Sequence, residues 1–161
     1  MTKGAGDVIA RILQFFRDNP EVVRQLGNAV QELAKNLLDF LRKKKEAKTD
    51  KERAKATADY ERESEKARVQ VWELRVRHQE QKLEELRLQL ELEQLRQRHG
   101  PVPTKKLRVA VERLEEKVAA QHQRTEASGA VSAAAEEVSE AADAQDEERL
   151  GVIARGLLLE G

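Results

Sequence analysis

The chain has 161 residues, of which 37 % are charged and only 3 % are aromatic, and this composition argues against a large globular core. It is typical of long helices and coiled coils. The 30 basic and 30 acidic side chains give a formal net charge of +0 and exclude a general attraction to nucleic acid or anionic lipid, while the lack of cysteine excludes disulfides and thiolate sites. We expect an all-α fold: an elongated coiled coil or helical bundle with an N-terminal helical hairpin and a long central helix.

The first predicted helix begins near Asp7 and ends near Arg17, with one broad apolar face that closes on Phe15 and Phe16. After it, Asn19-Pro20 predicts a helix start, because Asn caps a helix and Pro fits its first turn. The second helix carries apolar residues at alternating three- and four-residue steps, the spacing of a coiled coil. These residues are Val23, Leu26, Val30, Leu33, Leu37 and Phe40. We expect the first helix to fold back against the second.

A basic cluster closes the second helix, where positive charge suits the helix dipole. The basic cluster consists of Arg42, Lys43, Lys44 and Lys45. Thr49 to Glu52 then fits a capping box that would start a third helix. One continuous helix through this region is the alternative, since neither Gly nor Pro occurs between Asn28 and His99.

The third predicted helix, from about Asp50 to Arg98, has the most informative pattern, because two sets of apolar residues lie on opposite sides of it. The first seam keeps the heptad step and contains Val69, Trp72, Val76, Leu83, Leu86 and Leu90, with Gln79 as its polar member. The second seam contains Leu74, Leu88, Leu92 and Leu95. A two-stranded pair buries only one seam, so we expect this helix to lie in a bundle of three or more helices, formed within the chain or with a partner.

The segment from Gly100 to Pro103 is the clearest break, because Gly ends helices and Pro cannot continue them. Thr104 can cap a fourth helix, which we expect to end near Arg124. Its narrow apolar seam consists of Leu107, Val111, Leu114 and Val118. After so short a loop it should run antiparallel to the third helix and cover one of the two faces of that helix.

The C-terminal region is predicted to pack poorly. Ser128-Gly129 indicates another break, and residues 130–149 are rich in Ala and Glu, so we expect a solvated or partly frayed helix there. Acidic side chains between Glu126 and Glu148 form either a solubilising tail or a segment that docks on a basic stripe. The apolar segment 150–159 contains two Gly, which argue against a stable helix, so it is a docking peptide or a disordered end.

These elements divide the chain into four consecutive parts. Residues 1–48 form the helical hairpin that ends in the basic cluster, and residues 49–99 form the long coiled-coil helix. Residues 100–127 hold the break and the returning amphipathic helix, and residues 128–161 form the acidic, Ala-rich tail with its apolar end.

The sequence contains none of the local motifs on which common catalysis depends, such as a phosphate-binding Gly loop or a Ser nucleophile elbow. Its histidines, His78, His99 and His122, lie on separate segments without a second His at ligand spacing. We therefore expect no enzymatic activity, no cofactor or metal, and no small-molecule substrate.

The sequence predicts a scaffold or adaptor that acts through helix–helix contacts, with self-association or another helical protein as its partner. The apolar residues of both seams are the expected interaction residues. Trp72 has two readings, since it fits core packing at a helix crossing and also an anchor for a partner helix. We expect a cytoplasmic protein, because the chain shows neither a secretory leader nor an apolar stretch of membrane-spanning length.

Two alternatives remain open. A peripheral membrane protein would bind anionic lipid through Phe15, Phe16 and the basic cluster, as interfacial helices do. A nucleic-acid-associated protein would use the same cluster to contact phosphates, but the cluster lacks the interleaved aromatic residues that stack on bases.

Overall fold

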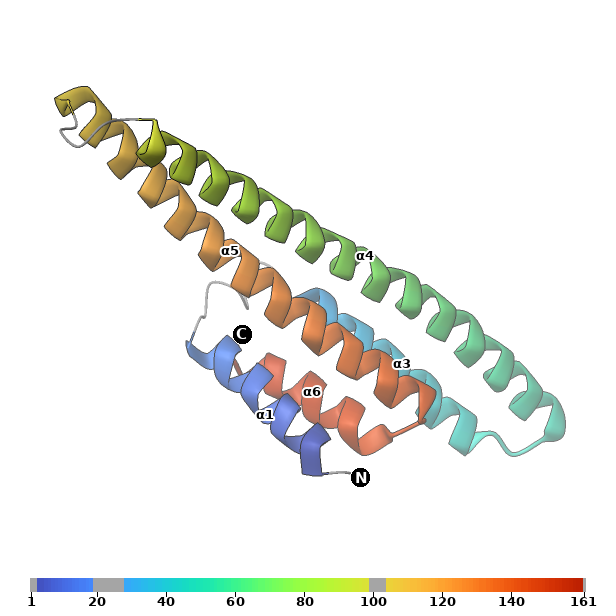
Figure 1. Cartoon of the computed structure of the whole chain (residues 1–161). Coiled ribbons are helices and arrows are strands. Elements are labelled where there is room, and N and C mark those ends of the chain that lie inside the picture. The colour runs from blue at the N-terminus through green and yellow to red at the C-terminus, as the bar shows by residue number, and fades with distance from the viewer. Residues whose placement is uncertain (1–2, 19–27, 99–103, 161) are drawn as a thin grey trace. The chain divides into compact units, whose positions relative to one another are not determined.

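The computed structural model describes residues 3–18, 28–98 and 104–160, and each regular element in these ranges is an α-helix, so the all-α prediction is confirmed (Figure 1). The helices are α1 (Lys3–Asp18), α3 (Asn28–Glu46), α4 (Asp50–Gln97), α5 (Lys105–Asp143) and α6 (Glu147–Glu160). They form two compact units. Unit 1 comprises Met1–Leu74 and Ala130–Gly161, and unit 2 comprises Arg75–Gly129.

Helices α3 and α4 are separate, which resolves the alternative of one continuous helix. Helix α3 ends at Glu46 and α4 begins at Asp50. The backbone N–H of Glu52 donates to Thr49 Oγ1 at 3.1 Å, and the Glu52 carboxylate accepts the N–H of Lys48 at 3.1 Å. This is the predicted capping box, with its return bond one residue earlier than usual. The local sequence therefore starts α4 where the pattern indicated.

Helix α5 runs without interruption through Ser128-Gly129, so the predicted break at this point and the predicted helix end near Arg124 are wrong. The reason lies on α4, where His78 Nδ1 is hydrogen-bonded to Ser128 Oγ at 2.9 Å. A Cβ atom on Gly129 would lie 2.9 Å from Cε1 of His78, so Gly129 leaves space for this ring. Here glycine allows close packing inside a helix instead of ending it.

The core of unit 1 includes residues from the apolar C-terminal segment, which forms α6. Leu150 is fully buried, and Ile153 and Ala154 are nearly so. Helix α6 packs against both α3 and α1 (Figure 1). At Gly156 the side chain of Leu13 comes so close that a Cβ atom would lie 2.6 Å from it. The two glycines thus do not prevent a helix, and the prediction of a non-helical end is wrong.

The Ala-rich part of α5 is buried, contrary to the predicted solvated or frayed helix. Each of its core residues is at most 4 % exposed. These residues are Val131, Ala134, Ala135, Val138, Ala141 and Ala142. Because Ala is small, neighbouring helices can approach this stretch closely, and its Cβ atoms become core. The small area of each Ala side chain therefore does not prevent burial, because several of them together form a flat surface against a neighbouring helix.

The turn between α5 and α6 is closed by backbone hydrogen bonds. Gln145 has a φ of 52°, the left-handed conformation of a helix C-cap. The N–H of Asp146 donates to the carbonyl of Ala141 at 2.8 Å, and the N–H of Gln145 donates to that of Ala142 at 3.0 Å. Asp146 Oδ1 then accepts the N–H of Arg149 at 3.1 Å and caps α6.

An ion pair with little solvent access connects α6 to α5 in unit 1. Arg149 Nη2 lies 2.7 Å from a carboxylate oxygen of Glu137, and both side chains are only 12 % exposed. Glu140 lies 3.6 Å from the same nitrogen. Since both side chains are largely removed from water, the loss of one would leave the other as a buried charge without an opposite charge beside it.

In unit 2, α5 returns antiparallel to α4. Leu88 and Leu92 of α4 form a small core with Leu114 of α5. Leu95, Val111 and Val118 pack around this core. The fourth predicted helix therefore covers one of the two apolar faces of α4 within the chain.

Candidate functional site

The apolar members of the first seam are mostly exposed on α4. Trp72, Leu83, Leu86 and Leu90 are each about 60 % exposed or more, and Val69 is 55 % exposed. Val76 is partly buried. Large apolar side chains are usually removed from water, and several of them exposed on one face of a helix commonly indicate an interaction surface. The first seam is therefore the candidate functional site.

The opposite side of α4 carries a longer row with the same heptad spacing, which we call the inner row. In unit 1 its members are Tyr60, Ser64, Ala67, Val71 and Leu74; in unit 2 they are His78, Gln81, Glu85, Leu88, Leu92 and Leu95. Each of them is buried or partly buried. At ~100° per residue the centre of this row lies about 160° from that of the first seam. The second seam is part of the inner row and is packed within the chain.

Sequence reasoning missed most of the inner row because its middle is polar. In unit 2, Gln121 Nε2 donates to the carbonyl oxygen of Gln81 at 3.2 Å and to its side-chain oxygen at 2.6 Å. Thr125 Oγ1 also donates to the Gln81 carbonyl, at 3.3 Å. These bonds satisfy polar groups that α5 would otherwise bury without partners. Heptad spacing that includes Ser, His and Gln would have revealed the row.

A charged group also links α4 to α5 in unit 2. His122 is hydrogen-bonded through Nδ1 to Glu85, and its Nε2 lies 3.0 Å from Glu126. The hydrogen bond to Glu85 is the main reason why the pKa of His122 is raised, and the negative charges of both carboxylates add to it. The imidazole side chain of His122 thus holds a proton more readily than usual.

The basic cluster makes contacts within unit 1. Lys45 Nζ lies 2.8 Å and Arg42 Nε 3.2 Å from Glu147, and these two bases, Lys45 first, lower the pKa of the Glu147 carboxyl. Lys44 Nζ donates to Gln145 Oε1 at 3.3 Å, and Lys43 lies over the Phe40 ring. The acidic segment therefore meets a basic stripe of its own chain.

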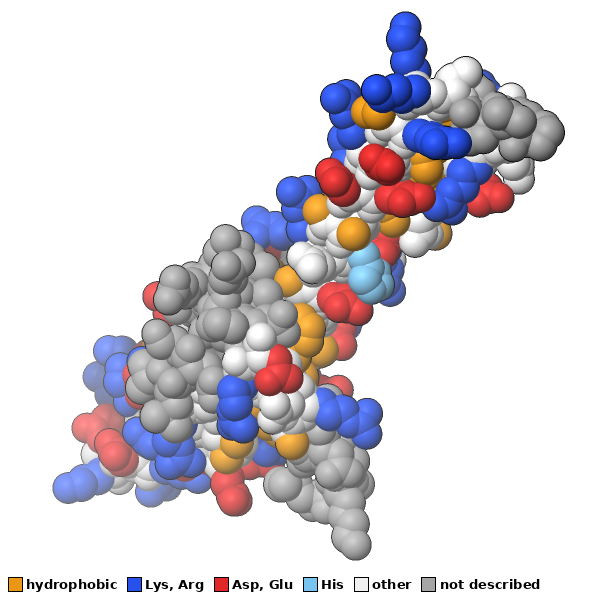
Figure 2. Space-filling model, turned by 90° about the vertical axis from the view of Figure 1, so that its left-hand side faces the viewer, with side chains coloured by type: hydrophobic (Ala, Val, Ile, Leu, Met, Phe, Trp, Pro, Cys, Tyr) orange, Lys and Arg blue, Asp and Glu red, His pale blue; other side chains and the backbone are white. Residues whose placement is uncertain are grey.

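A wide surface groove of about 970 Å³ lies beside these ion pairs in unit 1. Its charged lining is mixed, since Lys35, Arg42 and Lys45 alternate with Asp39, Glu147 and Glu148. Figure 2 likewise shows basic and acidic side chains interspersed on one face of the molecule. Such a mixture offers an anionic ligand both attraction and repulsion.

The apolar face of α1 is covered within unit 1. Ile9 is 7 % exposed, and it lies with Ile12 and Leu13 against Ile153 of α6. Phe15 is partly buried. The side chain of Phe16 lies outside the described part of the structure, as do Val23 and Leu26 of the predicted second-helix seam. The cover of α1 comes from α6, a helix that the sequence analysis did not predict.

Within the described ranges, no three His, Asp or Glu side chains are arranged so that they could hold a metal ion. In the same ranges, no helix combines the length and the apolarity needed to cross a membrane. In comparisons with known proteins, no family model, curated protein or solved structure matches the chain.

Proposed function

We propose that the protein is a non-enzymatic helical scaffold or adaptor that self-associates through the first seam of α4. The observation that carries this proposal is the exposure of Trp72 and the leucines in a heptad row, opposite a row that the chain already buries. A helix with two apolar faces needs a second neighbour to remove both from water. The partner-facing side of α4 is thus the first seam.

The free energy gained by burying the first seam is comparable to the cost of association, so self-association should depend on concentration. Complete burial of a large apolar side chain contributes about 1.5–3 kcal/mol, and the apolar first-seam residues other than Val76 are more than half exposed before association. Summed over two copies, the gain is on the order of 10 kcal/mol. Loss of translational and rotational freedom costs about 4–15 kcal/mol. Because gain and cost are similar in size, we expect monomers and assemblies to exchange with concentration.

Light scattering after size exclusion tests self-association directly, with masses that are multiples of 18.3 kDa expected as the concentration rises. Trp72 provides a second readout, because it is the single Trp of the chain and lies in the first seam. Its emission should shift to shorter wavelength as association buries the indole ring. A helical protein of 18.3 kDa at all concentrations, with unshifted emission, would contradict the proposal.

The double variant Leu83→Asp, Leu86→Asp should prevent association while keeping the helical circular dichroism spectrum of the monomer. Both side chains are exposed, at 66 % and 60 %, so their replacement removes little intrachain packing. Val109→Asp is the matched control, because Val109 is an exposed apolar residue of α5 outside the seam. It should associate like the unchanged protein.

Membrane binding through Phe15, Phe16 and the basic cluster is the competing proposal. It would require α1 to separate from α6, because Ile9 and Ile12 pack against Ile153. It predicts flotation with anionic liposomes that is weakened by salt. Flotation that is equal for the unchanged protein and the Leu83→Asp, Leu86→Asp variant would favour the membrane role over the scaffold.

A further inference from the structure

The residue type at each position of the first seam indicates which kind of helix can bind there. The seven positions of the heptad repeat are lettered a to g, and the seam consists of positions a and d. Val69, Val76, Leu83 and Leu90 occupy the a positions, and Trp72, Gln79 and Leu86 occupy the d positions. β-branched residues at a, together with Leu at d, favour two-stranded parallel coiled coils. The N-terminal half of the seam has Val at both of its a positions but Trp72 and Gln79 at d, and the C-terminal half has Leu at both a and d, so the seam meets this criterion only in part.

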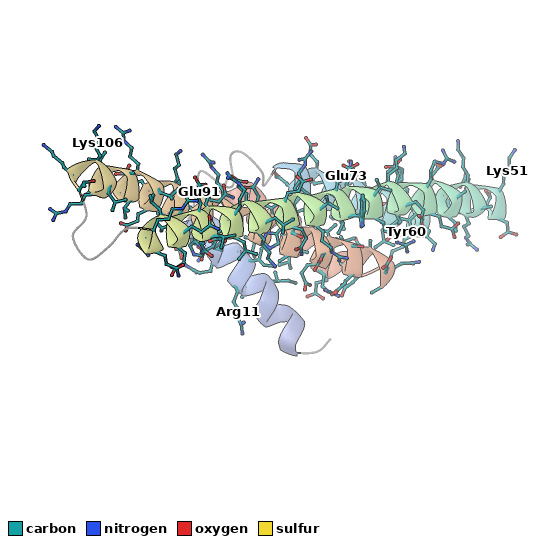
Figure 3. All side chains as sticks on the ribbon, turned by 45° about the horizontal axis from the view of Figure 1, so that its top comes forward. Arg11, Lys51, Tyr60, Glu73, Glu91 and Lys106 are labelled. Carbon is teal, nitrogen blue, oxygen red and sulfur yellow. The ribbon has the colours of Figure 1, made fainter. Side chains whose placement is uncertain are left out.

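Charged side chains flank the seam, with bases at the g positions and, apart from Arg87, acids at the charged e positions. The g positions are Arg68, Arg75, Lys82 and Gln89, and the e positions are Glu73, Glu80, Arg87 and Gln94. All of these side chains are exposed. Figure 3 shows Glu73 extending from α4 on a different side of the helix from Tyr60, which belongs to the inner row. The flanks are therefore exposed beside the first seam, and Arg75 would exchange its present interaction within the chain for one with the partner helix.

In a parallel, in-register pair, each g side chain lies beside the e side chain five residues later on the partner helix. Arg75 then meets Glu80, and Arg68, which also lies 2.7 Å from Asp143 of its own chain, meets Glu73. Lys82 meets Arg87, so one position is repulsive. In an antiparallel pair g positions face g positions, which sets Arg and Lys against one another, and e positions face e positions, where only Arg87 offers an attractive contact to Glu73 or Glu80. The charge pattern favours the parallel pair.

Gln79 also favours a parallel, in-register pair over an antiparallel one. In a parallel, in-register pair it faces its own copy, and two amide side chains can hydrogen-bond to each other. In an antiparallel pair, or with the helices displaced by a heptad, it faces an apolar side chain such as Leu83, Trp72 or Leu86. A single polar residue in an apolar seam commonly specifies register in this way.

We infer that the occupant of the first seam is α4 of a second copy of this chain, bound as a parallel, in-register, two-stranded coiled coil with Gln79 against Gln79 and Arg75 against Glu80. This inference rests on the proposed function, since it specifies the partner and geometry of the same surface. Helix α5 packs on the inner row, on the other side of α4, and leaves the first seam open to this approach.

The chain lacks cysteine, so a single introduced thiol reports the geometry without interference. In the inferred pair, Leu86→Cys should form a disulfide-linked dimer on mild oxidation, because each d position lies next to its own copy. Gln70→Cys is the matched control, since Gln70 is an exposed α4 residue on the side of the helix away from the seam. It should remain largely uncrosslinked under the same conditions.

Charge exchange tests, without oxidation, whether the charged flanks of two α4 helices meet. Glu80→Arg alone and Arg75→Glu alone should each weaken self-association, on the order of tenfold, because two attractive contacts per dimer become repulsive. A mixture of the two variants should restore association and form mainly heterodimers, in which both contacts are again attractive. An antiparallel pair predicts the same preference, because one variant is more positive and the other more negative along both flanks, so the crosslinking experiment decides the orientation.

The outcomes separate this inference from the function on which it rests. A protein that stays monomeric at all concentrations overturns both. Association that is lost in Leu83→Asp, Leu86→Asp keeps the proposed function. If such an assembly does not crosslink through Leu86→Cys, but a mixture of Leu86→Cys and Val76→Cys chains does, the pair is antiparallel and the inference alone is wrong.

Discussion

The hydroxyl of Tyr60 on α4 donates a 2.7 Å hydrogen bond to the backbone carbonyl of Ala142 at the end of α5. Figure 3 shows Tyr60 on the side of α4 that faces α5. Only 4 % of Tyr60 is exposed, and this burial is the main reason why the pKa of its hydroxyl is raised. The same carbonyl accepts the N–H of Gln145, so Tyr60 connects the first part of α4 to the turn that leads into α6.

Tyr60→Phe should lower the free energy of unfolding by about 0.5–1.5 kcal/mol, the net contribution of one buried hydrogen bond. The loss stays small because the Ala142 carbonyl keeps its bond to Gln145. Urea denaturation followed by circular dichroism measures the change. Tyr60→Ala is the comparison, and it should cost about 3 kcal/mol or more because it also removes the buried ring. If both variants lost the same free energy of unfolding, the buried ring would contribute nothing beyond the hydrogen bond, which would contradict this prediction.

Arg149→Met should destabilise unit 1 by about 3 kcal/mol, because it leaves the largely buried Glu137 carboxylate without its closest positive charge. The double variant Arg149→Met, Glu137→Leu should recover much of this loss, since both charges are then absent. The same denaturation experiment on single and double variants forms a double-mutant cycle. Additive losses would show that the pair is not coupled.

The same substitution, Leu to Ala, should have different effects on the two faces of α4, at Leu92 in the inner row and at Leu90 in the first seam. Leu92 is 7 % exposed in the core of unit 2, and its truncation should cost about 2–5 kcal/mol of stability. Leu90 is 59 % exposed, and its truncation should change the stability of the monomer by at most about 0.5 kcal/mol. Leu90→Ala should instead weaken self-association. Denaturation in dilute solution and mass measurements in concentrated solution provide the two readouts.

The pKa of His122 should lie above the ordinary value of 6.5, because the Glu85 and Glu126 carboxylates favour its protonated form. Its contribution to stability is then fully present below about pH 6.5, and it is lost as the pH rises through the folded-state pKa. A proton NMR titration of the imidazole measures the value, with His122→Gln identifying the resonance. Glu85→Gln should lower the His122 pKa, and an unchanged titration curve would contradict the assignment.

Local signals in the sequence predicted the starts of α4 and α5. The expected start of the first helix near Asp7 is wrong, because α1 begins at Lys3, and the expected start at Asn19-Pro20 lies outside the described residues. Thr49 and Thr104 cap α4 and α5 as expected, because a cap needs only a hydroxyl and the backbone N–H three residues later. The heptad spacing likewise predicted that α4 has two apolar faces. The same spacing did not indicate which face the chain itself would cover, since that depends on where α5 returns.

Interactions between distant residues account for the failed predictions. Glycine ordinarily weakens a helix, yet Gly129 and Gly156 lie inside helices where His78 and Leu13 approach closely. The Ala-rich stretch was expected to be solvated because Ala contributes little area, yet Ala135 and Ala141 are fully buried. In each case, close packing with another helix outweighs the local preference.

The sequence by itself determined the helical class, the helix starts at Thr49 and Thr104, and the two apolar faces of α4, because these depend on contacts within a few turns of one helix. Only the tertiary structure decided that the inner row is covered by α5, that α6 covers α1, and that the first seam stays exposed. The physical reason is that periodicity specifies which side of a helix avoids water, whereas the neighbour that covers it is chosen by packing between residues far apart in the chain.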